Sequence, residues 1–398
     1  MQGGVRDVGM LDVRHAAPAL RDLDAFVRAA GYLALERYPW PGQARHLYDD
    51  PGNLLRYLLG SSNVWRASAI ASVYYRRLAR LQPELSVLCD AFMLARPVSA
   101  ARLHAQASTP RCEQWRDAGL LVAIGDTYVS TVRATPGRGG LFWHDAPPGF
   151  RPSWVFLGAD SLRFARHLDR HLRRSTGRRV RRALDIGTGT GLHAARLATV
   201  ADDVVGIDIN PRAIDYARLN LELNGARNVV ARLSDLFDAV AGERFDLIVS
   251  NPPFLFLPPE WRARCIDGDG GALGMALTLR IVDGLAGHLA ADGRALLQAN
   301  SPVIAGSDLL IEELRARLGH GAWRVRLTPL HEFQDATFLD FYTAHRIDRF
   351  VAYLIEIERA DRFVLVRDAM SPWRRTACAL RIASVRARHR RRLAEGVA

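Results

Sequence analysis

The residues best suited to chemistry form the tetrapeptide Asn251–Pro252–Pro253–Phe254, which follows a short apolar run, Phe245–Val249. Two consecutive prolines fix φ and remove two N–H donors, so the backbone here offers only carbonyl oxygens. The Asn251 side-chain oxygen and the Pro252 carbonyl therefore make two acceptors of rigid geometry. Such a pair matches a planar –NH2 group, and Phe254 supplies an aromatic face for a flat substrate. The tetrapeptide predicts a site for an amide or an aromatic amine.

A second stretch, Ala183–Asn210, has the pattern of a nucleotide-binding loop. Two apolar runs, Ala183–Ile186 and Val204–Ile207, flank a glycine-rich turn and a helical pattern, His193–Thr199. This is the order of a βαβ unit, in which glycines let the turn reverse tightly and let a ligand touch bare backbone. Asp208 lies about twenty residues beyond the turn, where such folds place an acid that binds ribose hydroxyls. The stretch predicts a loop for a ligand that contains ribose.

The spacing of the glycines discriminates between ligands. It reads D-x-G-x-G-x-G from Asp185, and Leu192 stands where the dinucleotide fingerprint G-x-G-x-x-G needs its third glycine. A carboxylate at Asp185 suits a ligand with a cationic amino-acid end, whereas a pyrophosphate prefers positive potential. Here the sequence resembles class I S-adenosylmethionine (SAM)-dependent methyltransferases: LDIGTGTG is similar to their nucleotide-loop motif and GIDIN to their ribose-binding strand end. The resemblance implies SAM as the cofactor.

The resemblance also implies which residues bind each part of the cofactor. The glycine turn would hold the methionine end, the end of the second strand the ribose, and the end of the third strand the adenine amino group. In that order the residues are Asp185, Gly187, Thr188, Gly189 and Gly191, then Asp208 and Ile209, then Asp235 with the Leu236 backbone, and Asn251 would border the cofactor as well. No metal ligand is implied.

The tetrapeptide resembles the N/D-P-P-Y/F signature of amino-methyltransferases, which include release-factor glutamine, adenine-amino and ribosomal-RNA guanine-amino enzymes. The resemblance implies that Asn251 and Pro252 bind the target nitrogen and Phe254 its plane, with Pro253 completing the catalytic tetrapeptide. The nitrogen of an amide is a poor nucleophile because its lone pair is delocalised. Two acceptors holding its hydrogens restore that lone pair, and positioning aligns nitrogen, methyl carbon and sulfur for in-line transfer. Because the sulfonium is already activated, neither a nucleophilic residue nor a metal is required.

The elements that position these residues alternate between strands and helices. Strands are predicted at 183–186, 204–207, 229–233, 245–249, 295–299, 324–327 and 351–357, and helices at 160–174, 193–199, 211–224, 275–288 and 307–318. This alternation predicts an α/β fold with a doubly wound, mainly parallel Rossmann-like sheet. We expect a methyltransferase domain at 151–398, with the resemblance itself covering about 160–358. Residues 268–274 read as a helix-start loop, or alternatively as the hinge of a lid.

The first 150 residues predict a separate, mainly helical substrate or dimerisation domain. Periodic leucines indicate helices from about Ala16 to Leu88, with many aromatic residues among them. Next come three helical patterns at 85–94, 100–108 and 112–119, and then a hairpin over 120–135 that turns at Gly125–Asp126. This order resembles a winged helix, although the third helix carries too few unopposed basic residues for sequence-specific DNA binding. Residues 136–152 read as a glycine- and proline-rich linker.

The charge of the chain is positive and unevenly distributed. Of 398 residues, 54 are basic, all of them arginine, and the net charge is +12. Two clusters stand out: residues 163–182 hold nine arginines against Asp169, and residues 371–398 hold eight against Glu395. Such clusters are either solvated surface or contacts to a polyanion such as RNA.

The remaining signals exclude several classes of protein. No run of eighteen apolar residues exists, and the first residues lack the core of a signal peptide, so we expect a cytoplasmic protein without a membrane span. The four cysteines lie far apart, without the spacing of metal ligands or disulfides.

The sequence thus favours a SAM-dependent N-methyltransferase that acts on an amide or planar amino nitrogen of a macromolecule, either RNA or a translation factor. One alternative is a SAM-dependent enzyme of small-molecule metabolism, favoured by the N-terminal aromatics and the apolar run Leu255–Leu257. Another is a SAM-sensing or nucleic-acid-binding regulator, which would have no use for two rigid acceptors. The acceptor, the oligomeric state and the role of the arginine-rich tail stay open.

Overall fold

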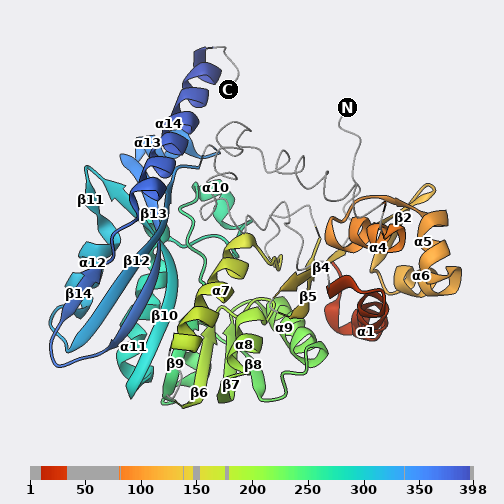
Figure 1. The fold of residues 1–398 in the computed structure, drawn as a ribbon, viewed down its shortest axis with the longest axis horizontal. Coiled ribbons are helices and arrows are strands. Elements are labelled where there is room, and N and C mark those ends of the chain that lie inside the picture. Colours follow the sequence, from red (N-terminus) through yellow and green to blue (C-terminus); the bar gives the residue numbers. More distant parts are fainter. Residues whose placement is uncertain are drawn as a thin grey trace.

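The computed structural model describes residues 10–33, 80, 82–137, 139–146, 153–174, 179–335 and 337–394. Its centre is a nine-stranded sheet of order β14-β12-β13-β10-β9-β6-β7-β8, to which β11 is added by pairing with β10 (Figure 1). The strands are β6 (Val180–Ile186), β7 (Ala201–Asp208), β8 (Val229–Leu233), β9 (Phe245–Ser250), β10 (Leu289–Ile304), β11 (Ser307–Asp308), β12 (Trp323–Phe333), β13 (Ile347–Arg359) and β14 (Val364–Arg367).

The sheet has a parallel half and an antiparallel half. Strands β10, β9, β6, β7 and β8 run parallel, which confirms the predicted Rossmann-like α/β architecture around the glycine turn. In the other half β13 is antiparallel to both β10 and β12, so the sheet is mixed. The strands predicted at 324–327 and 351–357 are the centres of these longer strands. The edge strand β14, parallel to β12, was not predicted.

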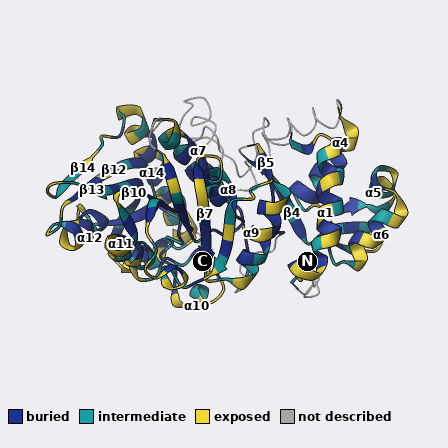
Figure 2. Ribbon diagram, turned by 90° about the horizontal axis from the view of Figure 1, so that it is seen from below, coloured by how far each residue is buried: buried dark blue, intermediate teal, exposed yellow. Residues whose placement is uncertain are grey.

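Helices cover the sheet, and its strands are largely buried (Figure 2). The five helices that the sequence predicts for this domain are confirmed to within two residues at each end. The helices are α7 (Ala159–Arg174), α8 (Leu192–Leu197), α9 (Pro211–Leu223), α10 (Pro259–Arg262), α11 (Ala276–His288), α12 (Leu309–Leu318), α13 (Leu339–Ala344) and α14 (Pro372–Ala394). The arginine-rich tail therefore forms α14, whose inner face packs on β12. No helix among the described residues is long and apolar enough to cross a membrane.

The N-terminal part contains helices and a small sheet. Its elements are α1 (Val13–Ala29), α4 (Pro83–Leu88), the π-helical segment η2 (Cys89–Met93), β1 (Val98–Ser99), α5 (Ala100–Ala107), α6 (Thr109–Asp117), β2 (Leu121–Ile124) and β3 (Thr127–Ser130). The hairpin turns at Gly125–Asp126 as predicted, and the sheet order is β1-β3-β2. Helix α6 begins three residues early, because Pro110 fits the first turn of a helix. The predicted helices between 34 and 79, with most of the N-terminal aromatics, lie outside the described residues.

The predicted linker at 136–152 is wrong over its first half. Strands β4 (Val132–Gly137) and β5 (Gly140–Asp145) form a second hairpin, and every residue of β5 is buried. The first hairpin, β2–β3, therefore ends at Ser130, whereas the sequence predicts that it continues to Thr135. Prolines and glycines flank β5 in the sequence, and this composition is typical of a linker. The strand forms because side chains far away in the sequence bind its backbone.

Helix α9 supplies those partners to β5. Asn220 and Asn224, one turn apart, exchange hydrogen bonds of 2.8–3.0 Å with the backbone of Trp143 and Leu141, as a neighbouring strand would. Asn220 also donates to the carbonyl of Thr190 at 2.9 Å, so β5 is tied to the glycine turn. The N-terminal core thus continues onto the methyltransferase sheet through α9.

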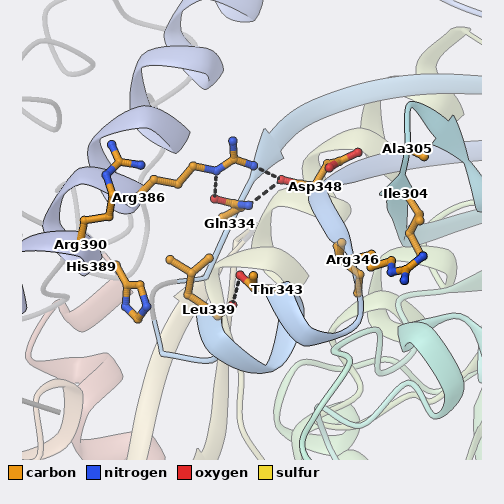
Figure 3. Close-up of a pocket in the computed structure, with 11 residues that line it drawn as sticks. Ile304, Ala305, Gln334, Leu339, Thr343, Arg346, Asp348, Arg386, His389 and Arg390 are labelled. Atoms are coloured by element: carbon orange, nitrogen blue, oxygen red, sulfur yellow. Dashed lines mark hydrogen bonds between the residues drawn. The ribbon is translucent and has the colours of Figure 1, made fainter. Parts of the chain in front are cut away.

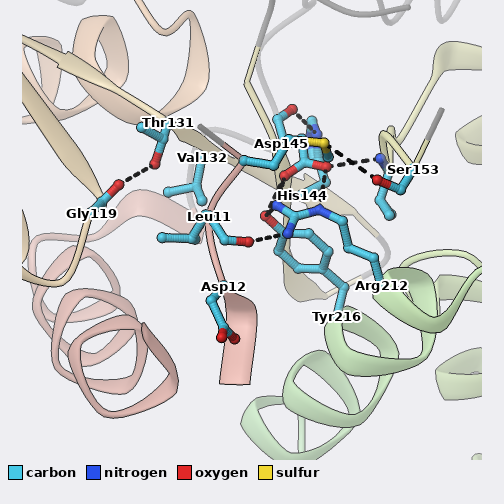
Figure 4. Close-up of polar contacts among 12 residues, drawn as sticks. Leu11, Asp12, Gly119, Thr131, Val132, His144, Asp145, Ser153, Arg212 and Tyr216 are labelled. Atoms are coloured by element: carbon cyan, nitrogen blue, oxygen red, sulfur yellow. Dashed lines mark hydrogen bonds and ion pairs between the residues drawn. The ribbon is translucent and has the colours of Figure 1, made fainter. Parts of the chain in front are cut away.

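A buried ion pair completes this contact (Figure 4). Arg212 on α9 pairs with Asp145 at the end of β5, and the two side chains are only 12% and 6% exposed. Tyr216 donates to the same carboxylate at 2.7 Å, and Arg212 also donates to the carbonyl of Leu11. Burial of this kind makes loss of one partner costly, because the remaining charge stays desolvated.

We therefore expect Arg212→Met to lower the free energy of unfolding by about 3 kcal/mol. The matched control is Arg21→Met, which removes the exposed Arg21–Glu222 pair of the same interface and should cost less than about 1 kcal/mol. Urea unfolding of both variants measures the difference. Equal losses in the two variants would show that the Asp145 pair does not hold the two parts together.

Candidate active site

The sheet register brings the predicted site residues to one edge. Ile186 of β6 is paired with Ser250 of β9 and with Ile207 of β7. The residues that follow these three positions are Gly187, Asn251 and Asp208. They therefore leave the carboxyl ends of three adjacent parallel strands, where open α/β sheets bind ligands.

Asp185 lies beneath the glycine turn and is completely buried. Its Oδ2 accepts hydrogen bonds from Thr188 Oγ1 at 2.7 Å and from the Ala194 backbone N–H at 3.0 Å. Its Oδ1 is buried and has no partner in the described part of the chain. Burial raises the pKa of this carboxyl, whereas the nearby His193 and these two hydrogen-bond donors lower it by a smaller amount. An unsatisfied buried carboxylate oxygen calls for a cationic or donor group of a ligand.

The glycine turn leaves space above itself. Gly187, Gly189 and Gly191 all have positive φ, and a Cβ added to Gly187 would meet no atom within 4 Å. At Gly191, by contrast, a Cβ would lie 3.3 Å from the Cα of Ala217 in α9. The close packing of the turn against α9 therefore favours glycine at this position. The open space next to Gly187 forms a cradle, a pocket of bare backbone that a bound ligand would fill.

Asp208 is held by the same turn. Its Oδ2 accepts from the Gly189 N–H and its Oδ1 from the Asn210 N–H, both at 2.9 Å. Each oxygen keeps a further lone pair, the arrangement needed to accept two ribose hydroxyls. Burial raises the pKa of Asp208 to about 6, against the backbone N–H donors that lower it. Ile209, predicted beside it, is 58% exposed.

This raised pKa predicts a pH dependence of cofactor binding. The ionised carboxylate accepts from the ribose, so protonation competes with binding as the pH falls through about 6. We expect the Kd for SAM to rise by up to about tenfold per pH unit below that value. Calorimetric titration from about pH 5 to about pH 8 measures it, and Asp208→Asn, which cannot titrate at this position, should bind more weakly and lose the transition near pH 6. A wild-type Kd that does not change with pH would contradict this role.

Asp235 and Leu236 follow β8 in the predicted adenine position. Asp235 forms an exposed ion pair with Arg280 of α11 at 3.1 Å, so a cofactor amino group would share its oxygens with that guanidinium. Leu236 has φ +46°, an uncommon conformation for a residue with a Cβ. The Ser234 hydroxyl stabilises the turn by donating to the Leu236 carbonyl at 2.7 Å.

Asn251 is part-buried, and its amide has a fixed orientation. Its Nδ2 donates to Asp160 Oδ2 at 2.9 Å and to Ser161 Oγ at 3.1 Å, both at the start of α7. Because an ionised carboxylate only accepts hydrogen bonds, Nδ2 must face Asp160, and Oδ1 must face the other way. There Oδ1 accepts one hydrogen bond from Gln298 Nε2 of β10 at 2.9 Å, which leaves its second lone pair for a substrate.

The sequence does not predict that Asp160, Ser161 and Gln298 support Asn251. Phe164, on the same helix as Ser161, is fully buried in the core. Gln298 is only 2% exposed, and its Oε1 has no partner within the described residues. The available signal was a lone glutamine inside a buried apolar strand.

The backbone after Asn251 is supported by the glycine-rich segment 268–274. Leu255 exchanges backbone hydrogen bonds with Gly268 and Gly270 at 2.8 and 2.9 Å. At Gly270 a Cβ would lie 2.8 Å from the Phe254 Cα, so a larger residue would displace the loop. The segment thus forms a close backbone support for the tetrapeptide.

Most of the apolar run Leu255–Leu257, which favoured the small-molecule alternative, is unavailable to a substrate, because only Leu255 is partly exposed. Phe256 and Leu257 are 5% and 2% exposed. Phe256 packs on Phe341 and Tyr342 of α13, with ring centroids 4.7 and 6.4 Å apart. These side chains therefore belong to a local core and leave Phe254 as the aromatic residue available to a substrate.

Comparison with known proteins identifies the family. The sequence model of one protein family, the methyltransferase small domain, matches residues 161–258 of this chain. A putative protein N5-glutamine methyltransferase of Methanocaldococcus jannaschii is 35% identical over 139 residues, which cover 33% of this chain and 67% of that protein. The chain belongs to the SAM-dependent methyltransferases of the small-domain family. The fit to SAM rests on the orphaned Asp185 oxygen, the open Gly187 cradle and the lone pairs of Asp208.

Two further relatives of this small-domain methyltransferase have known substrates in their names. The ribosomal protein uL3 glutamine methyltransferase of Xanthomonas campestris is 38% identical over 126 residues, covering 29% of this chain and 41% of that protein. The release factor glutamine methyltransferase of Escherichia coli is 41% identical over 76 residues, covering 19% and 27%. The chain thus spans less than half the length of these relatives.

Proposed function

We propose that this small-domain methyltransferase transfers the methyl group of SAM to the side-chain amide nitrogen of a glutamine in a ribosomal protein or a release factor. The observation that carries the proposal is the fixed Asn251 amide beside the glycine turn, with one lone pair of Oδ1 left for a substrate N–H. The named substrates of the relatives support the choice of glutamine, and the family match at residues 161–258 includes the tetrapeptide.

The cofactor residues have complementary roles in this proposal. SAM supplies a methyl group already activated on a sulfonium. Asp185 presents its unpartnered oxygen to the cationic amino-acid end, and Asp208 accepts the ribose hydroxyls. Gly187 lets the chain approach without a side chain in between, and Asp235 with Leu236 borders the adenine.

The acceptor residues position the nitrogen. Asn251 Oδ1 and the Pro252 carbonyl accept the two hydrogens of the glutamine –NH2, while Pro253 stiffens the turn and Phe254 covers the amide plane. The cofactor would supply the methyl group and keep the carbon–sulfur electron pair as a neutral thioether, and the nitrogen would give up one of these hydrogens as a proton to solvent. Asp160, Ser161 and Gln298 prevent Asn251 from rotating, so its oxygen stays aimed at the substrate.

The N-terminal part is proposed to bind the protein substrate. Three helices, a short strand and a hairpin support a winged-helix-like module within a domain that ends near residue 150. Its α6 is a poor reader of DNA, because Arg111 pairs with Asp22 at 3.2 Å and Arg116 with Asp117 at 3.1 Å. Protein docking or dimerisation is the role left for this module. An enzyme of ribosomal components would act in the cytoplasm.

Incubation with methyl-labelled SAM tests the function. The substrates are purified uL3, purified release factor and protein-free ribosomal RNA, followed by peptide mapping of the labelled product. We expect label on a glutamine side chain of a protein substrate and none when Asn251 is replaced by alanine. Label on a guanine of the RNA, or only on small molecules of a lysate, would overturn the assignment to protein glutamine.

A further inference from the structure

A cavity of about 550 Å³ lies between α13, α14, the start of β13 and the β10–β11 turn, away from every residue assigned to SAM or to the acceptor (Figure 3). Its lining is cationic: Arg386 and Arg390 come from α14 on one side and Arg346 from the other, with Asp348 the one acid among the lining residues. The lining also contains His389, which pairs with Asp340 at 2.7 Å.

None of these three guanidinium groups forms an ion pair with a carboxylate among the described residues, and Asp348 offsets only one of the three charges. Arg386 donates to the Gln334 side-chain oxygen at 3.0 Å and to the Asp348 carbonyl at 2.7 Å, both uncharged acceptors. Arg346 and Arg390 are exposed and form no ion pair with any described residue. The other arginine cluster differs, since Arg179 pairs with Asp202 at 2.7 Å. Free guanidinium groups thus face the cavity and can bind phosphate with paired N–H donors.

The rest of the lining fits more than a phosphate. Ile304, Leu339 and Ile347 provide apolar surface, which suits the face of a base. Asp348 and Thr343 provide oxygen acceptors, which suit exocyclic amines and the 2′-hydroxyl of ribose. The volume lies in the range of small-ligand sites and is large enough for a nucleotide unit. An acidic side chain would satisfy the arginines with its carboxylate, but it lacks the flat apolar face that a base offers to Ile304, Leu339 and Ile347.

We propose that this cavity binds a nucleotide unit of single-stranded RNA and that the exposed arginines of α14 continue the contact along the phosphate backbone. The exposed Arg391 and Arg392 extend the charge, because no acid occurs anywhere in α14. The helix α13 links this site to the acceptor loop, since Thr343 lines the cavity while Phe341 packs on Phe256. This inference rests on the proposed function: the enzyme methylates its protein substrate while RNA is bound to the enzyme.

Fluorescence anisotropy with a labelled oligouridine, titrated with the full chain at several salt concentrations, tests the site. We expect the double variant Arg346→Ala/Arg390→Ala to bind about tenfold more weakly, with a salt slope reduced by about 1.4, as for two phosphate contacts in a single strand. The matched control is Arg173→Ala/Arg227→Ala, which removes two exposed arginines from elsewhere and should bind like the wild type.

Three results would overturn the proposal: unchanged RNA affinity in the cavity variant, an equal loss in the control variant, or tighter binding of a labelled polyglutamate than of oligouridine. Methylation of an isolated glutamine peptide provides a separate readout. It should be the same in wild type and cavity variant, so failure of RNA binding is distinguishable from failure of the methyltransferase function.

Discussion

Replacement of Asn251 by alanine is expected to lower kcat by about 10²- to 10³-fold while the Kd for SAM stays unchanged. The loss is of this size because the substituted site no longer holds the acceptor nitrogen in line with the methyl carbon, and small misplacements or one lost preorganised hydrogen bond have effects of that order. Single-turnover methylation at saturating SAM, combined with calorimetric SAM binding, separates the chemical step from cofactor binding.

Asn228→Ala is the matched control for this variant. Asn228 also uses its amide N–H groups to bind carbonyls, those of Ala198 and Ala201, but it lies at the opposite end of the sheet. This control should lose stability and retain kcat per folded molecule. A similar fall of kcat in both variants, or a normal kcat in Asn251→Ala, would remove Asn251 from the chemistry.

Replacement of Gly187 by leucine is expected to weaken SAM binding by at least about 100-fold, because the side chain would occupy the open space that the cofactor needs. The chain offers an exact control in Gly225. Both glycines have φ +70°, and a Cβ added to either meets no atom within 4 Å. The two leucine variants should therefore share the same backbone strain and the same loss of stability.

Comparison of these two variants isolates the effect on binding. Thermal unfolding should shift equally, whereas only Gly187→Leu should lose affinity for SAM in calorimetry. If Gly225→Leu lost affinity to the same extent, strain would explain the effect. If Gly187→Leu kept normal affinity, the cofactor would have to bind elsewhere.

Local patterns in the sequence were sufficient to predict the half of the fold that contains the glycine turn. The glycines, Asp185 and Asp208 are encoded within one βαβ unit, and their geometry follows from strand ends and turn conformation. The tetrapeptide carries its own rigidity through its prolines, so its place after β9 could be predicted as well.

The parts that the sequence did not reveal depend on long-range contacts. Strand β5 reads as linker, and the side chains of Asn220 and Asn224, about eighty residues away, complete much of its hydrogen bonding. Gln298 reaches Asn251 across 47 residues because β10 lies beside β9, and nothing local marks that pairing. The cavity at α14 likewise requires the packing of four separate elements.

Asn251 is expected to present its oxygen to the nitrogen that receives the methyl group. A crystal structure of the protein with S-adenosylhomocysteine and a glutamine-containing peptide of uL3 would show this directly. The glutamine side-chain nitrogen should lie within about 3 Å of Asn251 Oδ1, facing the sulfur bound above Gly187. A glutamine bound elsewhere, or an Asn251 oxygen turned away from both sulfur and peptide, would contradict it.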